Sequence, residues 1–302
     1  MSFPQPGIFA LGTTAHAFAE YDCLQADLAA QSVGILARAS LGAATIRGLN
    51  VVVGVRPSLW NANFEPKCAA RDFDAPLRAP DGFAMPATQS DLWVWLAGAS
   101  QGAVFDGLRE ITESLGASAN LARSVSGFAY GQSQDLTGFE DGTENPPLGE
   151  ASEIALFAPD EDLAGASLAL VQLWEHDLGS FRGLGIAAQE AVIGRHKVSN
   201  LELDEQSMPV NAHVAKVSAS TDDGAPEIYR RSVPWGDMRA SGLNFVAFTN
   251  DQSRVEAMLA AMVSADGTGR DALTFYTTPR TGAYYLIPSL GMLATAAEDA
   301  GE

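Results

Sequence analysis

The first half of the chain alternates between short apolar runs with strand character and apolar stripes with helical spacing. In residues 22–39, Leu24, Leu28 and Ile35 fall roughly on one stripe, which predicts a helix. Residues 50–55 are short and rich in valine, which favours a strand. The predicted order is an apolar run, a helix, two strands, a helix and a closing strand, at residues 8–13, 22–39, 50–55, 92–96, 101–115 and 125–130.

The second half repeats this rhythm. Val255, Met258, Leu259 and Met262 follow one another at the i, i+3, i+4 and i+7 spacing of an amphipathic helix. Residues 210–217 alternate apolar and other side chains, which favours a strand. The predicted order is a strand, a helix, two strands, a helix and a strand, at residues 168–174, 181–193, 210–217, 243–248, 254–264 and 284–287.

Both halves therefore follow the order β-α-β-β-α-β, which is the order of the split-βαβ, ferredoxin-like unit. We predict an α+β fold in which each half has helices on one face of an antiparallel sheet and the two sheets pack together. Two sheets packed in this way can hold a flat ligand between them. The predicted units are an N-terminal half, a connection rich in Gly, Asp, Glu and Pro, a C-terminal half and a frayed acidic tail, at residues 1–133, 134–150, 151–292 and 293–302.

Residues 56–90 interrupt the first half. They contain five prolines and many polar residues, which predicts a long loop.

Composition and charge narrow the classes of partner. The 302 residues carry a formal net charge of −19, which disfavours nucleic acid and anionic membranes as partners. A neutral or cationic small molecule suits this charge, although acidity also serves solubility alone. No stretch approaches the roughly 18 consecutive apolar residues of a membrane span, and the first residues show no secretory signal.

The cysteines and histidines exclude several kinds of metal and redox site. Cys23 and Cys68 are far apart, so we expect no disulfide framework and a reducing, cytoplasmic location. No CxxCH motif is present, so a haem would not be attached covalently in the c-type manner. The four histidines lack the spacing of zinc ligands.

The most unusual segment is the connection, residues 138–146, which reads GFEDGTENP. Gly142 permits a positive φ, and Asn145 before a proline favours a turn. The carboxylates Glu140, Asp141 and Glu144 are compatible with a solvated acidic turn. A calcium loop is a poorer interpretation because the D-x-D-x-D-G spacing is missing.

Two further segments carry candidate chemistry in the second half. His213 lies in the predicted strand at 210–217, where a histidine is usually a core or surface residue. Arg230 and Arg231 precede a Pro-Trp-Gly turn, where an arginine pair is usually surface charge. Neither segment by itself indicates a function.

Together, the three segments resemble the dye-decolorizing peroxidase family, in the form typical of its bacterial cytoplasmic branch. GFEDGTENP is similar to the GxxDG signature of that family. Other segments resemble family members in the same order: VQLWEHDL (171–178), QEAVIGRHK (189–197), IYRRSVPWG (228–236), GLNFVAF (242–248) and TGAYYLIPS (281–289). The resemblance covers most of the chain after about residue 125, whereas the first 120 residues match in rhythm only.

The resemblance implies a fold of two ferredoxin-like halves with one non-covalent haem b per chain, between sheet and helices. It implies that His213 ligates the iron and that Asp141 and Arg230 lie on the peroxide side. Arg231 is the alternative to Arg230, but strand alternation would direct it to the opposite face. Ser232 shares the face of Arg230 and could hydrogen-bond a distal water.

The implied activity is that of a haem peroxidase, with hydrogen peroxide and a small-molecule reductant of the dye or phenol type as partners. Asp141 would move the peroxide proton, and Arg230 would stabilise the departing oxygen, leaving a ferryl species that takes single electrons. We expect the charge of Arg230 to keep Asp141 ionised near neutrality. A haem carrier or a protein that releases iron from porphyrin is the alternative, and a haem-free ferredoxin-like binding module is a third.

Other residues are implied as cofactor contacts. We expect Asp271 to accept the second N–H of His213, and Arg195 to pair with a haem propionate. Phe245, with Leu243 on the same strand face, could form a wall of the haem site or simply pack the core. The motif residues Gly142, Thr143 and Glu144 are also expected to contact the cofactor. His176 and His196 are interpreted as structural or surface residues, and the family implies a homo-oligomer, a dimer or larger.

Overall fold

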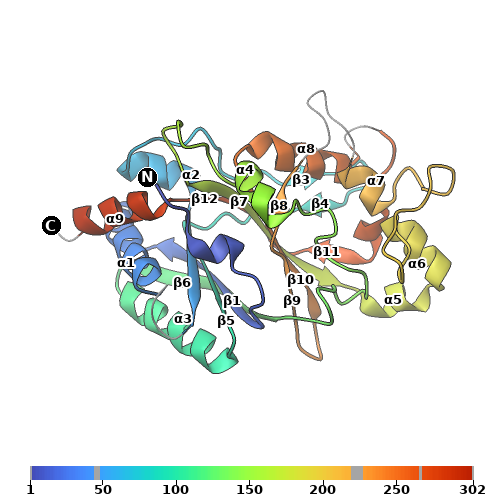
Figure 1. The fold of residues 1–302 in the computed structure, drawn as a ribbon, viewed down its shortest axis with the longest axis horizontal. Helices are drawn as coiled ribbons and strands as arrows, with labels where there is room; N and C mark the ends of the chain where they lie inside the picture. The colour runs from blue at the N-terminus through green and yellow to red at the C-terminus, as the bar shows by residue number, and fades with distance from the viewer. Residues whose placement is uncertain (1, 44–47, 219–226, 265–266, 301–302) are drawn as a thin grey trace.

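The computed structural model describes residues 2–43, 48–218, 227–264 and 267–300 (Figure 1). The N-terminal half is built on β1 (Ala15–Cys23), α1 (Ala29–Ala43), β2 (Asn50–Val55), β5 (Leu92–Gly98), α3 (Gln101–Leu115) and β6 (Ala119–Phe128). Short elements precede or interrupt it: η1 (Pro6–Phe9), η2 (Ala26–Leu28), α2 (Pro57–Asn63), β3 (Leu77–Arg78) and β4 (Ala84–Met85).

The C-terminal half follows the connection. Its helices are α4 (Leu148–Ala155), α5 (Leu178–Gly183), α6 (Ile186–Ile193), α7 (His213–Val217), α8 (Gln252–Met262), η3 (Ala272–Phe275) and α9 (Leu290–Asp299). Its strands are β7 (Ser167–His176), β8 (Tyr229–Arg230), β9 (Val233–Gly236), β10 (Ser241–Thr249), β11 (Thr277–Pro279) and β12 (Ala283–Ile287). Within these described elements, every helix is too short or too polar to cross a bilayer.

The strands form one antiparallel sheet that closes on itself. Within the described ranges its order is β11-β7-β12-β2-β5-β1-β6-β9-β10-β8, and β7 also pairs with β10. The two halves meet at two narrow seams, where single residue pairs join Val55 to Leu286 and Gly127 to Trp235. The predicted α+β fold with antiparallel pairing is confirmed, with the refinement that the two half-sheets are joined edge to edge.

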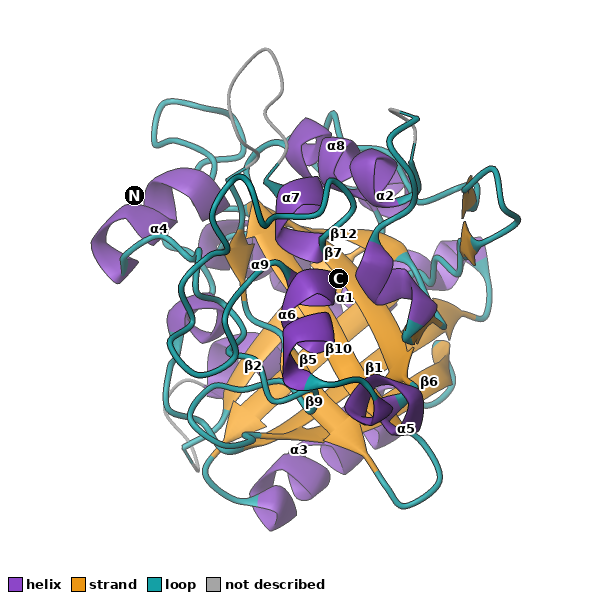
Figure 2. Cartoon of the chain, turned by 90° about the vertical axis from the view of Figure 1, so that its right-hand side faces the viewer, coloured by secondary structure: helices purple, strands orange, loops and turns teal. Residues whose placement is uncertain are grey.

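Both faces of the central strands are buried, which explains why β5 is apolar at every position. Trp93 and Trp95 point into a core enclosed by both half-sheets, where Phe248 and Tyr285 meet them. The alternate residues of β5 belong to a second core that includes residues of α1, α3 and α9. A third core includes residues of α8 and of β7 and β10. Figure 2 shows α5, α6 and α7 on the side of the sheet that faces the viewer, where the site lies.

Several predicted elements need correction in the first half. The first strand is β1 rather than the run at 8–13, and it was hidden because it buries the polar residues His16 and Glu20. The predicted helix at 22–39 starts seven residues later, since its first part belongs to β1 and η2. The predicted strand at 125–130 is the end of the longer strand β6. The predicted loop at 56–90 contains α2 and the β3–β4 pair.

Three predicted elements of the second half need correction, and α4, β8, β9 and β11 were not predicted. The predicted helix at 181–193 divides into α5 and α6 around Leu184 and Gly185. The predicted strand at 210–217 is wrong, because its last five residues form α7. The predicted tail at 293–302 is not frayed over its described part, since α9 buries Leu293 and Ala296 and packs on α1. The strands β7, β10 and β12 and the helix α8 agree with the prediction within a few residues.

Candidate functional site

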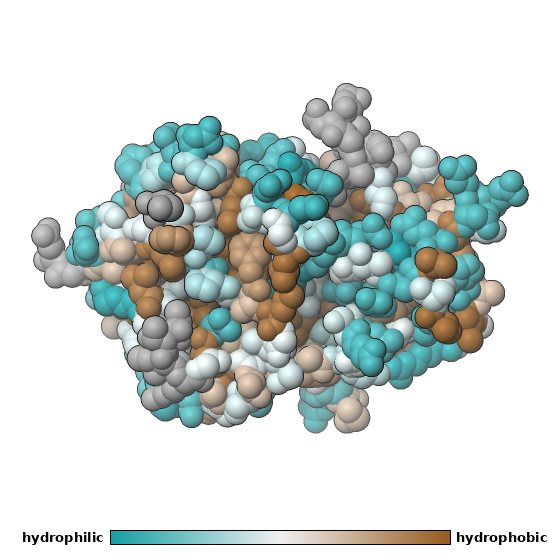
Figure 3. Space-filling view, viewed as in Figure 1, coloured by the Kyte–Doolittle hydropathy of each residue, from teal (hydrophilic) through white to brown (hydrophobic). Residues whose placement is uncertain are grey.

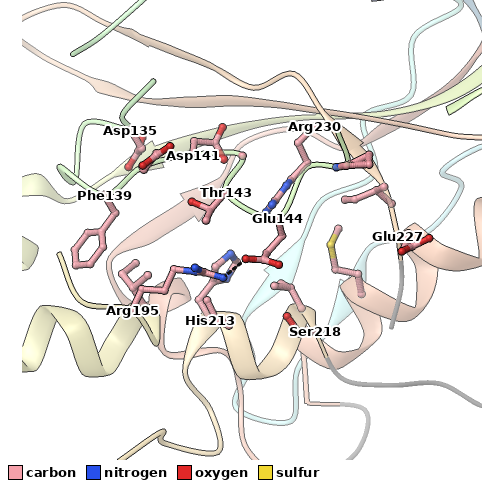
Figure 4. A pocket seen from close by; sticks show the side chains of 18 of the residues that line it. Asp135, Phe139, Asp141, Thr143, Glu144, Arg195, His213, Ser218, Glu227 and Arg230 are labelled. Carbon is pink, nitrogen blue, oxygen red and sulfur yellow. Dashed lines mark hydrogen bonds and ion pairs between the residues drawn. The ribbon is translucent and has the colours of Figure 1, made fainter. Parts of the chain in front are cut away.

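A cavity of about 520 Å³ opens between α7, the loop that precedes α4 and the strand β8. This volume lies in the range of small-molecule and cofactor sites. Its walls include His213, Asp141 and Arg230, with Leu243 and Met258 among the apolar residues. Figure 4 shows His213 rising from α7 on one side, with Asp141 and Arg230 on the other.

His213 is held by a buried carboxylate. Its Nδ1 lies 2.7 Å from Oδ2 of Asp271, which is fully buried. Asp271 is itself fixed, because its Oδ1 accepts the N–H of Leu273 at 2.8 Å and its own N–H donates to Met262 O at 3.0 Å. Because the carboxylate accepts a hydrogen bond from Nδ1, we place the proton of the neutral ring on Nδ1. Nε2 then carries a lone pair and has no hydrogen-bond partner within the described ranges, as a metal ligand requires.

The loop of residues 133–146 is folded tightly onto itself. The N–H of Asp141 donates to Ser133 O at 2.9 Å, and an isolated bridge joins Gln134 to Glu140. Gly142 has a φ of +80°, a conformation that L side chains rarely adopt. The motif thus needs glycine directly after Asp141 so that the chain can reverse and present that carboxylate to the cavity.

Asn145 ties this loop to the strand that carries Arg230. Its Oδ1 accepts the N–H of Arg230 at 2.8 Å, and its Nδ2 donates to the carbonyl of the same residue at 2.8 Å. From sequence, Asn145 is predicted only to favour a turn, because its partner lies 85 positions away. Asn145 therefore holds Asp141 and Arg230 in register with each other.

We expect Asn145→Ala to lower the rate of any reaction that needs Asp141 and Arg230 together by about tenfold, because misplacement by an ångström costs up to about 100-fold. Asn250→Ala is the matched control, since Asn250 also donates to two carbonyls, those of Glu153 and Leu156. Both variants lose hydrogen bonds worth about 1 kcal/mol each, so their melting temperatures should fall alike. Equal reaction rates in the two variants would contradict the role of Asn145.

Asp141 is partly buried, and its electrostatics differ from expectation. Burial raises the pKa of its carboxyl above the usual range, and the negative charge of Asp135 adds to this effect. The nearby charge of Arg230 opposes the rise in pKa without cancelling it. Arg230 therefore lowers the pKa of Asp141 as expected, but the net shift is upward, because the cost of burying the charge is larger.

Arg230 of β8 brings an unpaired polar group to the cavity: its Nε is buried without a regular hydrogen-bond partner among the described residues. Ser232 Oγ, just beyond β8, is also buried without a regular partner there, but Ser232 does not line the cavity. Arg231 turns the other way, donating to Ile8 O and Ala10 O and stacking on Trp95 at 5.0 Å. The structure therefore places Arg230 at the cavity and Arg231 away from it. Buried polar groups without partners are rare, so this wall fits a polar ligand.

Arg195 lies at the cavity but has partners already. Its side chain forms an ion pair with Glu144 and a second one with Glu202 at 2.6 Å, and Nη1 donates to Asn200 O at 2.9 Å. Asn200 also bonds Thr143, at 2.7 Å. Glu144 is 58% exposed and reaches over the space above His213 in Figure 4, so it must turn aside if Arg195 is to bind an acidic group there.

The strand β10 supplies the apolar wall. Leu243 and Phe245 line a cavity that shares His213, Asp141 and Arg230 with the larger one, whereas the intervening Asn244 is buried on the other face. The expected alternation along this strand is therefore present. His176, predicted to be a structural or surface residue, also lines both cavities. His196 is half exposed, pairs with Glu190 and does not line them.

Comparison with known proteins gives consistent matches. A family model described as "Dyp-type peroxidase, C-terminal" matches residues 132–292. A dye-decolorizing peroxidase of Mycolicibacterium paratuberculosis is 32% identical over 251 residues, which cover 81% of this chain and 71% of that one. One of Rhodococcus erythropolis is 31% identical over 252 residues, covering 82% and 74%.

Solved structures agree over nearly the whole chain. A variant of Rhodococcus jostii RHA1 DypB in complex with heme superposes with a TM-score of 0.87 at 29% identity, covering 97% of this chain and 98% of that one. A dye-decolorizing protein from V. cholerae gives 0.86 at 28% identity, covering 96% and 99%.

Proposed function

The chain belongs to the dye-decolorizing peroxidase family, and from this premise we propose that it binds one non-covalent haem b between His213 and the Asp141–Arg230 wall and reduces hydrogen peroxide there. The observation that carries the proposal is Nε2 of His213, which has no hydrogen-bond partner among the described residues. Asp271 fixes the ring at the other nitrogen, and His213 lines a cavity whose opposite wall presents Arg230 with an unpaired Nε. Neither cysteine lines the cavity, which supports non-covalent binding.

Each residue has a defined task in this proposal. His213 supplies the iron ligand, and Asp271 keeps the proton on Nδ1 so that Nε2 remains a donor to metal. Leu243 and Phe245 cover the porphyrin, and Arg195 binds a propionate once Glu144 has moved. Gly142 and Thr143 place the loop backbone beside the cofactor. When bound, haem supplies the redox chemistry that takes two electrons to peroxide and recovers them singly from organic donors of the dye or phenol type.

The distal residues move the proton and bind the charge. Ionised Asp141 accepts the proton from the inner oxygen of hydrogen peroxide and returns it to the outer oxygen, which leaves as water. Arg230 stabilises the negative charge that develops on that outer oxygen. Ser232 Oγ lies close enough to Asp141 to lower the pKa of its carboxyl, and it can hold a water or peroxide in place.

The direct test is titration of the protein with haem, followed by rapid mixing with peroxide. We expect a saturable Soret band at one haem per chain and a fast spectral change that a phenolic or dye donor reverses. Haem binding without a fast change would favour the carrier or iron-releasing alternative. Absence of a Soret band would refute the haem site itself.

We expect the rate of the peroxide reaction to fall on acidification. Asp141 must be ionised to accept the first proton, and its pKa is raised, so its ionised fraction declines at a pH above the ordinary aspartate value of about 4. Stopped-flow rates measured from about pH 4 to pH 8 should therefore rise to a plateau. Asp141→Asn should remove this dependence, and a wild-type rate that stays flat down to about pH 4 would contradict the assignment.

We further infer that each half is a ferredoxin-like unit. The main strands of the N-terminal half lie in the sheet order β2-β5-β1-β6, which is 2-3-1-4 when they are numbered along the chain. Those of the C-terminal half lie in the order β12-β7-β10-β9, which is 4-1-3-2. The second order is the reverse of the first, so both halves have the same strand topology. This supports two equivalent ferredoxin-like units. The haem would then lie between the second unit's sheet and its helices.

We also propose that the protein is a cytoplasmic homo-oligomer. Two free cysteines support a reducing location. Large apolar side chains such as Phe3, Leu11 and Leu148 are exposed. Figure 3 shows apolar residues near the centre of the viewed face, among hydrophilic ones. Exposed apolar surface of this kind supports an interface between copies of the chain. Measurement of the molecular mass in solution tests this proposal.

A further inference from the structure

A second histidine–carboxylate pair lies at the cavity, and neither member takes part directly in the proton transfer proposed above. His176 ends β7, and its Nε2 lies 3.0 Å from Oδ1 of Asp135. Both side chains are largely buried, with exposed fractions of 6% and 13%. The other ring nitrogen, Nδ1, lies 2.7 Å from Oγ1 of Thr277 on β11. The imidazole is therefore fixed at both nitrogens and cannot rotate without losing a bond.

The surroundings of Asp135 favour its ionised form. Its Oδ2 accepts the N–H of Thr137 at 3.0 Å and the hydroxyl of the same residue at 2.6 Å. With His176 this makes three donors to one carboxylate, and they hold the pKa of Asp135 below its usual range although burial acts in the opposite direction. Since an ionised carboxylate only accepts, the ring proton that faces it is assigned to Nε2 of His176.

Asp135 and Asp141 lie beside each other because of the fold of their loop. The N–H of Asp135 donates to Phe139 O at 2.9 Å, and the N–H of Asp141 donates to Ser133 O at 2.9 Å. Figure 4 shows the two side chains side by side at one end of the cavity. A negative charge fixed on Asp135 disfavours a second negative charge on the neighbouring Asp141.

Other charged groups around the pair are engaged elsewhere. Arg230 faces Asp141 from β8 and opposes Asp135. Arg182 of α5 and Lys197 donate to the carbonyls of Leu136 and Thr137, at 3.2 and 2.9 Å.

The remaining carboxylates of the loop turn away from Asp141. Glu140 accepts from Asn200 at 2.9 Å, and Glu144 pairs with Arg195. Asp135 is therefore the carboxylate that the loop presents to Asp141.

We propose that Asp135 and His176 form a positioning pair for Asp141: His176 keeps a negative charge on Asp135, and this charge controls the protonation state of the distal acid–base residue. The proposal rests on the proposed function of Asp141. It adds a reason for the buried histidine at the end of β7, which neither ligates metal nor contacts Asp141 by any hydrogen bond in the described structure.

The experiment measures the rate of the peroxide reaction against pH for the haem-loaded wild type and for four variants. Asp135→Asn removes the charge, and we expect the midpoint of the pH profile to move down by about one unit. His176→Leu removes the donor that keeps Asp135 ionised, and the midpoint should move in the same direction. His176→Gln can still donate an N–H to Asp135, so its midpoint should stay near that of the wild type. His196→Gln, at an exposed histidine–glutamate pair outside the cavity, is the matched control.

The outcomes separate the two proposals. If Asp141→Asn, measured alongside, keeps the wild-type profile, the role of Asp141 fails. If Asp141→Asn removes the profile but Asp135→Asn leaves the midpoint unchanged or moves it upward, only the present inference is overturned. A loss of rate by one constant factor at every pH, with an unaltered Soret band, would identify the pair as merely structural and would also overturn it.

Discussion

The His213→Ala variant is expected to lose iron coordination and more than about 100-fold in haem affinity. Changing a residue that only hydrogen-bonds a metal ligand lowers metal affinity by about 10- to 100-fold, and removing the ligand itself should lower it further. Asp271→Asn should fall in that smaller range, because Asp271 acts on the iron only through Nδ1 of His213. Titration with haem, followed at the Soret band, measures both affinities.

The control for His213→Ala is a histidine that does not line the cavity. His196 serves as this control, because it is half exposed and bonds only Glu190 among the described side chains. His196→Ala should bind haem as the wild type does. If His213→Ala kept a wild-type spectrum and affinity, the assignment of the iron ligand would be wrong.

The second large effect is expected for Arg230→Leu, which should slow the reaction with peroxide by about 100- to 1000-fold. This is the range found when one donor that stabilises developing negative charge is removed. Haem affinity should change little, since the backbone of Arg230 rather than its side chain is bound by Asn145. Stopped-flow traces at several peroxide concentrations give the rate constant.

Arg109→Leu is the control for that substitution. Arg109 lies on α3 in the other half and pairs with Glu113 on the surface. Its loss should leave the peroxide reaction unchanged. An Arg230→Leu variant as fast as the Arg109→Leu control would show that the charge on the departing oxygen is stabilised elsewhere.

Long, regular patterns were predictable from sequence, and short elements were not. The spacing in residues 254–264 identifies α8, because several turns repeat the same stripe. The alternation at residues 210–217 predicted a strand where the structure has α7, because five helical residues are too few to show a helical period. The role predicted for His213 does not depend on this error, since it rests on the motif and not on the type of element.

Contacts between distant segments account for the rest. Asn145 and His176 show their importance only through partners that lie 85 and 41 positions away, and no local pattern reports such a contact. The sign of the pKa shift of Asp141 is a similar case. The sequence indicates the opposite charge of Arg230, but the cost of burial depends on how completely the surrounding chain excludes water.

The narrow seams of the sheet have a consequence for folding. Only one described residue pair joins the halves at each seam, so few backbone hydrogen bonds hold them together. Cohesion comes instead from the shared aromatic interior, to which one half contributes Trp93 and Trp95 and the other Phe248 and Tyr285. A chain divided in the 134–150 connection would expose that interior on both fragments. We therefore expect the two halves to fold only together, although each has its own complete set of strands.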